Sequence, residues 1–502
     1  MKTKLKVDMR PVSPPTFAPS DPPWFAPFVW AAVVVGAGLR SSAAMNDFWV
    51  DEVWSLELGL SAPTWASVFW GISQDNNHPL NTLWMRWIGP EGSSLMHRLP
   101  SIVFGSAAVC VAARLARRHA GPAAGVAAAI LFATGLLFVN YGSEARGYGA
   151  MILGLLVAMD AVDEWVRGVR NRWTSARICG GLAAASLSHM LAVPAAAILG
   201  AVASAALWMN AGAASLALPA VIRLGLHFAA GIAPAVAAFV AGVAITGSFT
   251  RHSHEPYTVE GHLEGLALNL QLFVVPLWLA WPWALTVGAG LVLAALMVIR
   301  PGIRAAYAGG ILATALVAAA AQAPDPQYPR FHIPFSIAVA LLGALGVGAA
   351  WTRGGLARAA AVILFSGVTL LNLIESLLLS ERGRGQPRTA ISIMTRDGPA
   401  TYFDAIEGSA PRRLRHYIEQ DAKPLTRVML STFCDAPPDW LLDSQTPEDA
   451  MQTRRFGPPG CEAEFELVKY LWTGRVSGHP FSIYRRTPPE VAPTQEPRRP
   501  GP

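Results

Sequence analysis

Charged residues are scarce in this chain of 502 residues. Asp, Glu, Lys and Arg make up 14% of it and hydrophobic residues 53%, whereas an ordinary soluble domain is about a quarter charged. The charges are sparse from about residue 24 to 378 and reach an ordinary density after about residue 380. This distribution excludes a soluble protein for most of the length and predicts a membrane body that carries a small polar tail.

Lysine is missing from most of the chain, since none occurs between Lys6 and Lys423. The net charge of +6 comes mostly from arginines that cluster in short segments beside apolar runs. Nucleic acid is therefore a poor explanation of the basic charge, because nucleic-acid sites gather their cations on one face of a domain. We expect no nucleic-acid partner.

Cysteine is rare as well, with four residues at no spacing typical of a metal site. Cys110 and Cys179 lie in apolar segments, whereas Cys434 and Cys461 lie in the polar tail. Two interpretations of the tail pair stay open. The pair forms a disulfide in an oxidising compartment, or it consists of two free buried thiols.

The apolar residues form runs that are long enough to cross a bilayer, which takes about 20 residues. They predict a mainly α, polytopic membrane protein with about eleven transmembrane helices. The runs lie at 24–42, 99–116, 121–140, 147–163, 175–192, 192–210, 224–247, 276–299, 305–322, 333–351 and 357–378.

Arginines and lysines alternate between the segments that join these runs, as the positive-inside rule requires. With a cytoplasmic segment at 1–23, the membrane domain spans 24–379 and the tail is extracytoplasmic, as a small α/β domain at 380–485 and a disordered end at 486–502. The first run, followed by Ser42-Ala43-Ala44, could instead be a signal peptide, although ten further spans need no export signal. The cations expected inside are Lys2, Lys4, Lys6, Arg10, Arg114, Arg117, Arg118, Arg167, Arg170, Arg172, Arg177, Arg223, Arg300, Arg304, Arg353 and Arg358.

The first outer loop, at 43–98, is long and contains no stretch able to cross. Its apolar residues fall on one face of each of two short helices, which predicts helices lying along the membrane surface. The two faces consist of Trp49, Val53, Leu56 and Leu60, and of Trp65, Val68, Phe69 and Ile72.

Asp51 and Glu52 stand at the start of this loop. An ionisable residue at the rim of a membrane is a functional candidate. Adjacent carboxylates on a helix point about 100° apart, so the two cannot share one substrate atom. One can accept the proton of a hydroxyl as general base while the other pairs with a cation or orients the acceptor. The plainer alternative is a solvated acidic pair.

Three further elements place an arginine at the outer rim. A cationic rim suits a lipid phosphate that leaves with developing negative charge, although each arginine alone could simply reach lipid headgroups. The elements are His78-Pro79-Leu80 with His97-Arg98-Leu99-Pro100-Ser101, then Tyr141-Gly142-Ser143-Glu144-Ala145-Arg146-Gly147-Tyr148, and Tyr328-Pro329-Arg330-Phe331.

In this order, the elements resemble those of a known family over roughly residues 25–380. The Asp-Glu pair, the His-Pro-Leu and Arg-Leu-Pro-Ser elements and the Tyr-x-x-Glu-Ala-Arg-Gly-Tyr element are similar to those of the dolichyl-phosphate-mannose protein mannosyltransferase and aminoarabinose transferase group of C-type (GT-C) glycosyltransferases. The resemblance implies an enzyme that takes a sugar from an isoprenoid phosphate, with Asp51 as base and Glu52 as its motif partner. The substrate-binding residues expected are His78, Arg98, Tyr141, Glu144, Arg146, Tyr148 and Arg330.

Two departures suggest altered donor or acceptor contacts. Many relatives read His-Pro-Pro-Leu where this chain has His78-Pro79-Leu80-Asn81, and Tyr-Ser-Gln-Glu where it has Tyr141-Gly142-Ser143-Glu144. The tail matches no sequence pattern that we can place. No Gly-rich phosphate loop or nucleotide-fold pattern occurs, which argues against direct use of a nucleotide sugar.

A zinc site is conceivable in the loop Arg251-His252-Ser253-His254-Glu255 with His262. A solvated polar loop between two spans is the commoner outcome. The resemblance requires no metal. We therefore expect arginines as the counter-charge and no metal ligands, and a divalent cation stays an open alternative.

We thus expect a bacterial inner-membrane glycosyltransferase, a hexosyl- or pentosyltransferase that inverts the anomeric carbon. Its donor would be a polyprenyl-phosphate sugar, of undecaprenyl or decaprenyl type, and its acceptor a hydroxyl of a lipid, glycan or protein. A lipid or glycolipid transporter or flippase is the first alternative, but transporters show internal repeats and charge near the midplane. A catalytically silent lipid-binding or assembly protein is the second.

Overall fold

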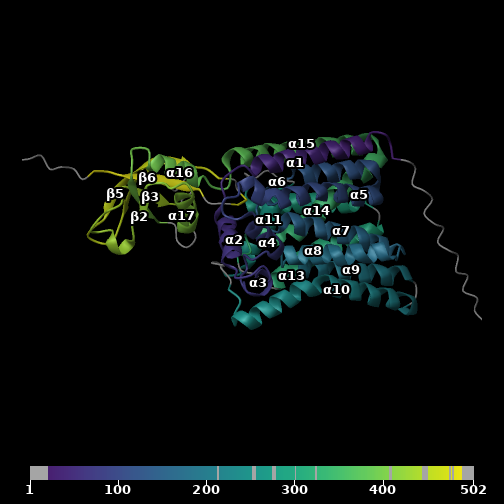
Figure 1. The fold of residues 1–502 in the computed structure, drawn as a ribbon. Coiled ribbons are helices and arrows are strands. Elements are labelled where there is room, and N and C mark those ends of the chain that lie inside the picture. The colour runs from purple at the N-terminus through teal and green to yellow at the C-terminus, as the bar shows by residue number, and fades with distance from the viewer. Residues whose placement is uncertain are drawn as a thin grey trace, which may run out of the picture.

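The computed structural model describes residues 21–211, 214–250, 256–273, 279–299, 301–320, 322, 325–405, 410–443, 450–473, 476–477 and 480–488. It has two parts, a large helical body and a small C-terminal α/β domain at one end of it (Figure 1). The helices of the body are α1 (Phe25–Ala43), α2 (Val50–Ser61), α3 (Ser67–Trp70), α4 (Pro79–Ile88), α5 (Ser94–Thr134), α6 (Leu136–Tyr141), α7 (Tyr148–Val166), α8 (Arg172–Ser188), α9 (Ala192–Ala211), α10 (Ala214–Thr246), α11 (Val259–Gln271), α12 (Trp281–Val298), α13 (Pro301–Ala320), η1 (Pro329–His332), α14 (Ile333–Arg353) and α15 (Gly355–Arg382).

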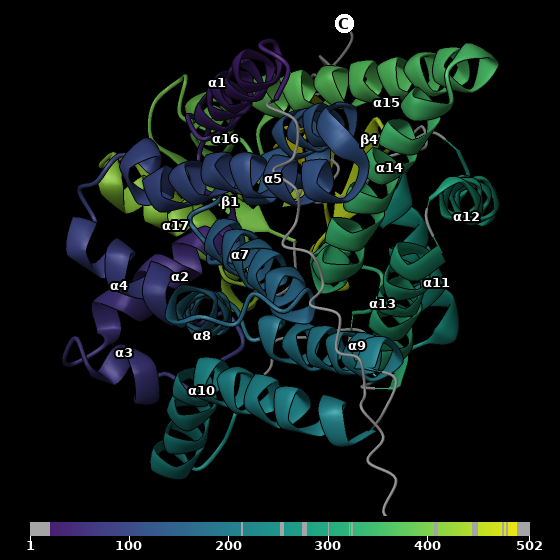
Figure 2. The same cartoon turned by 90° about the vertical axis from the view of Figure 1, so that its right-hand side faces the viewer.

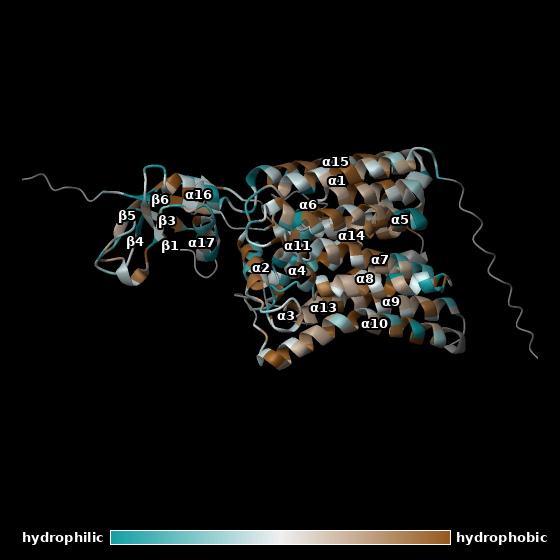
Figure 3. Ribbon diagram, in the orientation of Figure 1, coloured by the Kyte–Doolittle hydropathy of each residue, from teal (hydrophilic) through white to brown (hydrophobic). Residues whose placement is uncertain are grey.

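The long helices of the body lie side by side, and α12 stands at one edge in the end view (Figure 2). Large apolar side chains point outward from them, for example Trp30 on α1 and Ile363 on α15, which are 62% and 71% exposed. Helices that are apolar on all sides are typical of a membrane body. Figure 3 shows this apolar middle, with hydrophilic residues gathered towards both ends.

Within the described residues, seven helical segments are long and apolar enough to cross a membrane. They are Phe25–Ala43, Ser94–Thr134, Ala192–Asn210, Ala217–Thr246, Trp281–Val298, Pro329–Arg353 and Gly355–Met394. The mainly α, polytopic class is therefore confirmed. The count of eleven stays a prediction.

Two of the expected runs are combined in α5. Its backbone reverses at Ala120 and Gly121, whose φ and ψ are not helical, and Gly121 has a φ of 83° that only glycine adopts easily. A Cβ added at Gly125 would lie 3.0 Å from the Ala113 carbonyl oxygen, so the two halves pack against each other. The runs 99–116 and 121–140 are thus the arms of one helical hairpin.

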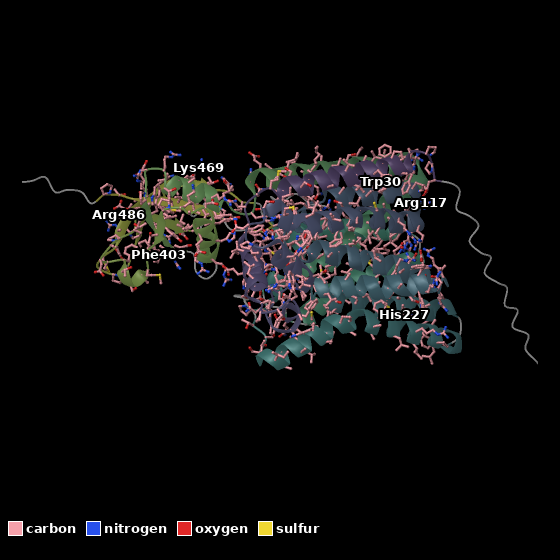
Figure 4. The ribbon with its side chains drawn as sticks, viewed as in Figure 1. Trp30, Arg117, His227, Phe403, Lys469 and Arg486 are labelled. Carbon is pink, nitrogen blue, oxygen red and sulfur yellow. A yellow bond between two sulfur atoms is a disulfide. The ribbon has the colours of Figure 1, made fainter. Side chains whose placement is uncertain are left out.

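Two other runs, α7 and α8, lie in the same bundle but are less apolar or shorter. α7 carries Asp160, Asp163 and Glu164 near its C-terminal end, and α8 has 17 residues. Arg118 pairs with all three of these acids, from 2.8 to 3.0 Å. Arg117 belongs to the segment that the sequence analysis placed inside, together with Arg118. It lies at the end of the body that is far from the C-terminal domain, where Lys469 and Arg486 are labelled (Figure 4).

The first long loop folds across the other end of the body, next to the C-terminal domain (Figure 1). The two expected short helices are present as α2 and α3, with Val53, Leu56 and Val68 buried. Leu60 and Trp65 are exposed, at 43% and 52%. A third helix, α4, was not predicted, and Pro79 at its first turn suits a helix start.

The C-terminal domain contains a six-stranded mixed sheet in the order β2-β1-β3-β6-β5-β4. Strands β2, β1 and β3 are parallel, and β6, β5 and β4 continue antiparallel from β3. Its elements are α16 (Pro387–Met394), β1 (Ala400–Asp404), α17 (Ala410–Gln420), β2 (Leu425–Arg427), η2 (Leu430–Thr432), β3 (Trp440–Asp443), β4 (Thr453–Phe456), β5 (Ala463–Leu471) and β6 (Phe481–Arg486).

A disulfide joins Cys434 to Cys461 in this domain, with their Cα atoms 5.3 Å apart. Of the two interpretations of the tail cysteines, the disulfide is therefore the one that the structure contains. The bond ties the segment after η2 to the turn between β4 and β5. Cys110 and Cys179 are free thiols in the helical body.

Thiol labelling tests this arrangement. We expect a maleimide mass tag to modify two cysteines, Cys110 and Cys179, in the denatured, unreduced protein, and four after reduction. The Cys434→Ser variant should accept three tags without reduction, because Cys461 then has no partner. Four tags on the unreduced wild-type chain would contradict the disulfide.

Candidate active site

The site forms where α2 begins, at the end of the body nearest the C-terminal domain. The backbone N–H of Trp49 donates to Glu52 Oε2 at 3.1 Å, which caps the first turn of α2. Because neighbouring residues of a helix point in different directions, the two carboxylates separate. Glu52 is fully buried, whereas the Asp51 side chain is 17% exposed.

Glu52 forms a buried ion pair with Arg98 of α5. Arg98 Nε lies 2.7 Å from Glu52 Oε1 and Nη2 lies 2.5 Å from Oε2, and both side chains are fully buried. The remaining N–H groups of Arg98 donate to the carbonyl oxygens of Ala44, Asn46 and Asp47. An arginine has five N–H donors, so all those of Arg98 are used inside the protein.

Burial alone would raise the pKa of Glu52, but the adjacent Arg98 guanidinium outweighs burial and holds the pKa of this carboxyl below its ordinary value. A further donor, the backbone N–H of Ala145, lies 2.6 Å from Glu52 Oε1. Glu52 is therefore an ionised, fully bonded group that joins α2, α5 and the segment at 144–146.

Asp51 has a different environment, since two arginines converge on one of its oxygens. Arg146 Nη1 lies 2.8 Å and Arg330 Nη1 2.9 Å from Asp51 Oδ2. Among the described residues, Oδ1 of Asp51 accepts no hydrogen bond. One oxygen of the only partly exposed carboxylate is thus held, and the other is open.

The two arginines keep unused donors. Arg146 makes one further hydrogen bond, from Nη2 to Asn76 Oδ1 at 2.9 Å, and its buried Nε has no partner among the described residues. Its guanidinium lies over the rings of Trp49 and Tyr148. Arg330 lies over the rings of Tyr328 and Phe331. Aromatic faces stabilise a guanidinium while leaving its N–H groups free for an anion.

Aromatic and imidazole rings line the site behind Arg146. His78, Tyr148 and His189 stack, with ring centroids 4.6 Å apart for His78–His189 and for Tyr148–His189, and Tyr141 lies 4.7 Å from Tyr148. Burial lowers the pKa of His78 well below its ordinary value, and the nearby His189, Arg146 and Arg330 lower it further. The ring is neutral at physiological pH, and its buried Nε2 has no partner in the described part of the chain.

A cavity of about 280 Å³ opens beside these rings, between the first loop and helices α8 and α10. His78, Asp75 and His189 lie at its polar side, and apolar residues that include Phe239, Leu191 and Phe331 line the rest. Its lining thus combines polar and apolar side chains and includes Phe331, the residue after Arg330.

Glu144 lies in a separate buried network behind Arg146. Its Oε1 accepts from Asn140 Nδ2 at 2.9 Å and lies 3.3 Å from Arg384 Nε, and burial raises its pKa. The chain passes closely behind it, since a Cβ added at Gly147 would lie 1.8 Å from the Ser188 carbonyl oxygen. Only glycine fits there, and this close approach sets the path of the residues on either side of Arg146.

The structure thus brings together the site residues expected from the sequence, but it separates their roles. Asp51, Arg146, Arg330, His78, Tyr141 and Tyr148 surround one centre. Glu52 and Arg98 do not face it, because each is saturated by the other and by backbone groups. Glu52 thus pairs with a cation, one of the roles that the sequence left open for the second acid, and the substrate contact expected of Arg98 stays a prediction.

Several residues of the site carried no signal in the sequence. Asn76, His189 and Arg384 occur in no element that was singled out, and only the fold places them here.

The metal site considered in the sequence is not supported by a cluster of ligands within the part of the chain that the structure describes. The loop at 251–255 lies outside the described residues, and His262 packs against the His332 ring, with the ring centroids 5.1 Å apart. In the described part of the chain, no three His, Cys, Asp or Glu side chains gather as a metal site.

The fold and site together define the class of protein: a polytopic membrane protein with a surface-lying first loop, an acidic and arginine-rich centre, and a C-terminal α/β domain. No protein-family model matches the chain, and no curated protein matches it. Among solved structures, ArnT from Cupriavidus metallidurans bound to undecaprenyl phosphate is similar, with a TM-score of 0.51 and 12% identity over 92% of this chain and 97% of that one.

The apo state of the same ArnT is similar as well, with a TM-score of 0.50 and 14% identity over 85% of this chain and 93% of that one. ArnT is an aminoarabinose transferase with a GT-C fold. At this level of identity the likeness shows the fold. The chain therefore has the GT-C fold expected from the resemblance.

Removing the charge of Glu52 tests its structural role. In Glu52→Gln, Arg98 stays buried without a counter-ion, and breaking a buried pair in this way typically costs about 3–5 kcal/mol. We expect a loss of that order in the free energy of unfolding, measured by SDS titration in mixed micelles.

The matched control is Glu57→Gln on the same helix. Glu57 pairs with Arg412, and both side chains are 36% exposed, so the expected loss is about 0–1 kcal/mol. Equal losses in the two variants would show that the Glu52–Arg98 pair has no special structural role.

Proposed function

We propose that this chain transfers a sugar from a polyprenyl-phosphate carrier to an acceptor hydroxyl, with Asp51 as general base. The observation that carries the proposal is the state of the Asp51 carboxylate. One oxygen is bound by Arg146 and Arg330, and the other accepts no hydrogen bond from the described residues. The GT-C fold supports the same reaction class.

In the reaction, Oδ1 of Asp51 accepts the proton of the acceptor hydroxyl. The acceptor oxygen attacks the anomeric carbon as the bond from that carbon to the phosphate oxygen breaks, and the polyprenyl phosphate leaves with the bonding electrons. A single displacement of this kind inverts the anomeric centre. The proton on Asp51 then passes to solvent, to which the side chain is partly open.

Arg146 and Arg330 supply the charge that the leaving phosphate needs. Each has unused N–H donors, in contrast to Arg98, and preorganised donors aimed at developing charge are a large source of rate enhancement. In the described state these arginines bind Asp51. Charge-assisted hydrogen bonds to phosphate are of the same kind, so in the donor complex the two guanidinium groups would be shared between the phosphate and Asp51.

The cavity beside His78 fits the carrier end of the donor. Its apolar side chains suit a prenyl chain, and Arg330, which directly precedes the lining residue Phe331, would supply a cation for the phosphate. Within the proposed function we keep a hexose or pentose as the sugar and a lipid, glycan or protein hydroxyl as the acceptor. The same proposal places the site and the C-terminal domain on the extracytoplasmic face, which the Cys434–Cys461 bond supports because disulfides persist in oxidising compartments.

The transporter alternative is not favoured by the fold. The charges of the site lie at one end of the body around α2, whereas a transporter would carry charge near the midplane. Mass spectrometry of membrane glycolipids and secreted glycoproteins, from cells with and without the gene, should show the loss of one sugar modification.

Asp51→Asn tests the base directly. The amide keeps the shape of the side chain but cannot take a proton, so turnover should fall at least about a hundredfold. We would measure transfer of label from a panel of radiolabelled undecaprenyl-phosphate sugars in membrane vesicles. Binding of undecaprenyl phosphate, measured by native mass spectrometry, should persist. Near-normal turnover of an Asp51→Asn protein would remove Asp51 as the base.

Arg330→Gln tests the counter-charge. Losing one donor that stabilises the leaving group typically lowers kcat by about 10²–10³-fold, and we expect undecaprenyl phosphate to bind more weakly as well. Arg353→Gln is the control, because Arg353 is an exposed arginine at the C-terminal end of α14, whereas Arg330 precedes the N-terminal end of that helix. Equal activity of the two variants would contradict the role of Arg330.

A further inference from the structure

The C-terminal domain reaches the active centre through the connection between β5 and β6. Ser477 lies in this connection and is 6% exposed. Its neighbour Val476 packs against the main hydrophobic core of the helical body. Val476 and Ser477 therefore both contact the helical body.

Ser477 completes the buried network around Glu144. Its hydroxyl donates to Glu144 Oε1 at 2.5 Å and accepts from Asn140 Nδ2 at 2.8 Å. Glu144 is fully buried, and its Oε2 has no partner among the described residues. Ser477 is therefore one of the few groups that hold this carboxylate in place, and it is separated from Glu144 by 333 positions in the sequence.

The two residues that follow Glu144 each contact one acid of α2: Ala145 contacts Glu52, and Arg146 contacts Asp51. The N–H of Ala145 donates to Glu52, and the guanidinium of Arg146 donates to Asp51. Three successive residues thus contact Ser477, Glu52 and Asp51. A displacement of Glu144 would move Arg146, which lies two residues further along the chain.

A second contact keeps the C-terminal domain in place on the other side of the site. The N–H of Phe48 donates to the Tyr417 hydroxyl of α17 at 2.6 Å, and Arg412 pairs with Glu57 at 2.8 Å. Residues of α2, among them Val53 and Leu56, share a hydrophobic cluster with Leu414 and Tyr417. The domain therefore contacts both α2 and the 144–146 segment, the two pieces of chain that meet at Asp51.

We propose that Ser477 is a positioning residue which the C-terminal domain supplies to the site: its hydroxyl fixes Glu144 and thereby the segment that carries Arg146. The proposal rests on the sugar transfer proposed above. It gives the C-terminal domain a role in the chemical step, whereas a domain that only recruits an acceptor would act on acceptor affinity.

Ser477→Ala tests the proposal in the full-length protein. The hydrogen bond is made to a carboxylate, so its loss should lower kcat by about tenfold to a hundredfold. KM for the undecaprenyl-phosphate sugar and for the acceptor should stay within about twofold. Ser477→Thr keeps the hydroxyl and should restore most of the activity.

Two controls separate this role from a general loosening of the domain. Ser431→Ala removes an exposed serine of the same domain, and Arg412→Gln removes an ion pair that holds the domain but does not reach Glu144. Both should keep kcat near that of the wild-type chain. A fall in kcat in Arg412→Gln as large as in Ser477→Ala would overturn the proposal, because weaker docking would then explain both.

A higher acceptor KM with unchanged kcat in Ser477→Ala would also overturn it, since that pattern belongs to acceptor recruitment. The failure of this proposal differs from the failure of the proposed function. Normal turnover in Ser477→Ala beside an inactive Asp51→Asn removes only the positioning role, whereas normal turnover in Asp51→Asn removes the base itself.

Discussion

The buried ion pair between Glu52 and Arg98 is the constraint on which the rest of the site depends. Two charges removed from water are costly unless each is bonded on every side. This requirement draws backbone groups of Ala44, Asn46, Asp47 and Ala145 to the pair. The end of α1, the start of α2, the start of α5 and the segment before α7 are thus joined at one point.

This pair also explains how two neighbouring acids come to have different roles. Glu52 points inward, where every bond that it makes is structural, and it gives α2 a fixed orientation. Asp51 is then the residue that the helix turns towards Arg146 and Arg330. A solvated acidic pair, which was the plainer interpretation, would leave both carboxylates exposed.

The sequence predicted the class of fold and singled out Asp51 as a candidate, because both inferences depend on local properties. Apolar runs show where helices lie, and the 100° turn between neighbouring residues already required Asp51 and Glu52 to diverge. The direction of divergence depends on Arg98, 46 positions away. Arg98, Arg146 and Arg330 are the same residue type at the ends of similar helices, so only the fold distinguishes the saturated arginine from the two with spare donors. No sequence pattern marks Arg384 or Ser477 as part of the site, because their partners lie more than 200 positions away in the sequence.

The position of Arg146 is restrained by the residues that precede and follow it in the chain. On one side, Ala145 is bonded to Glu52, and Glu144 is held by Asn140, Arg384 and Ser477. On the other side, Gly147 packs so closely on Ser188 that no side chain fits. A guanidinium held in this way needs little reorganisation when negative charge develops near it, which is where electrostatic catalysis gains its advantage over water. The buried carboxylates of Glu144, which precedes Ala145, and of Glu52, which accepts from the N–H of Ala145, would then contribute to sugar transfer without touching the sugar.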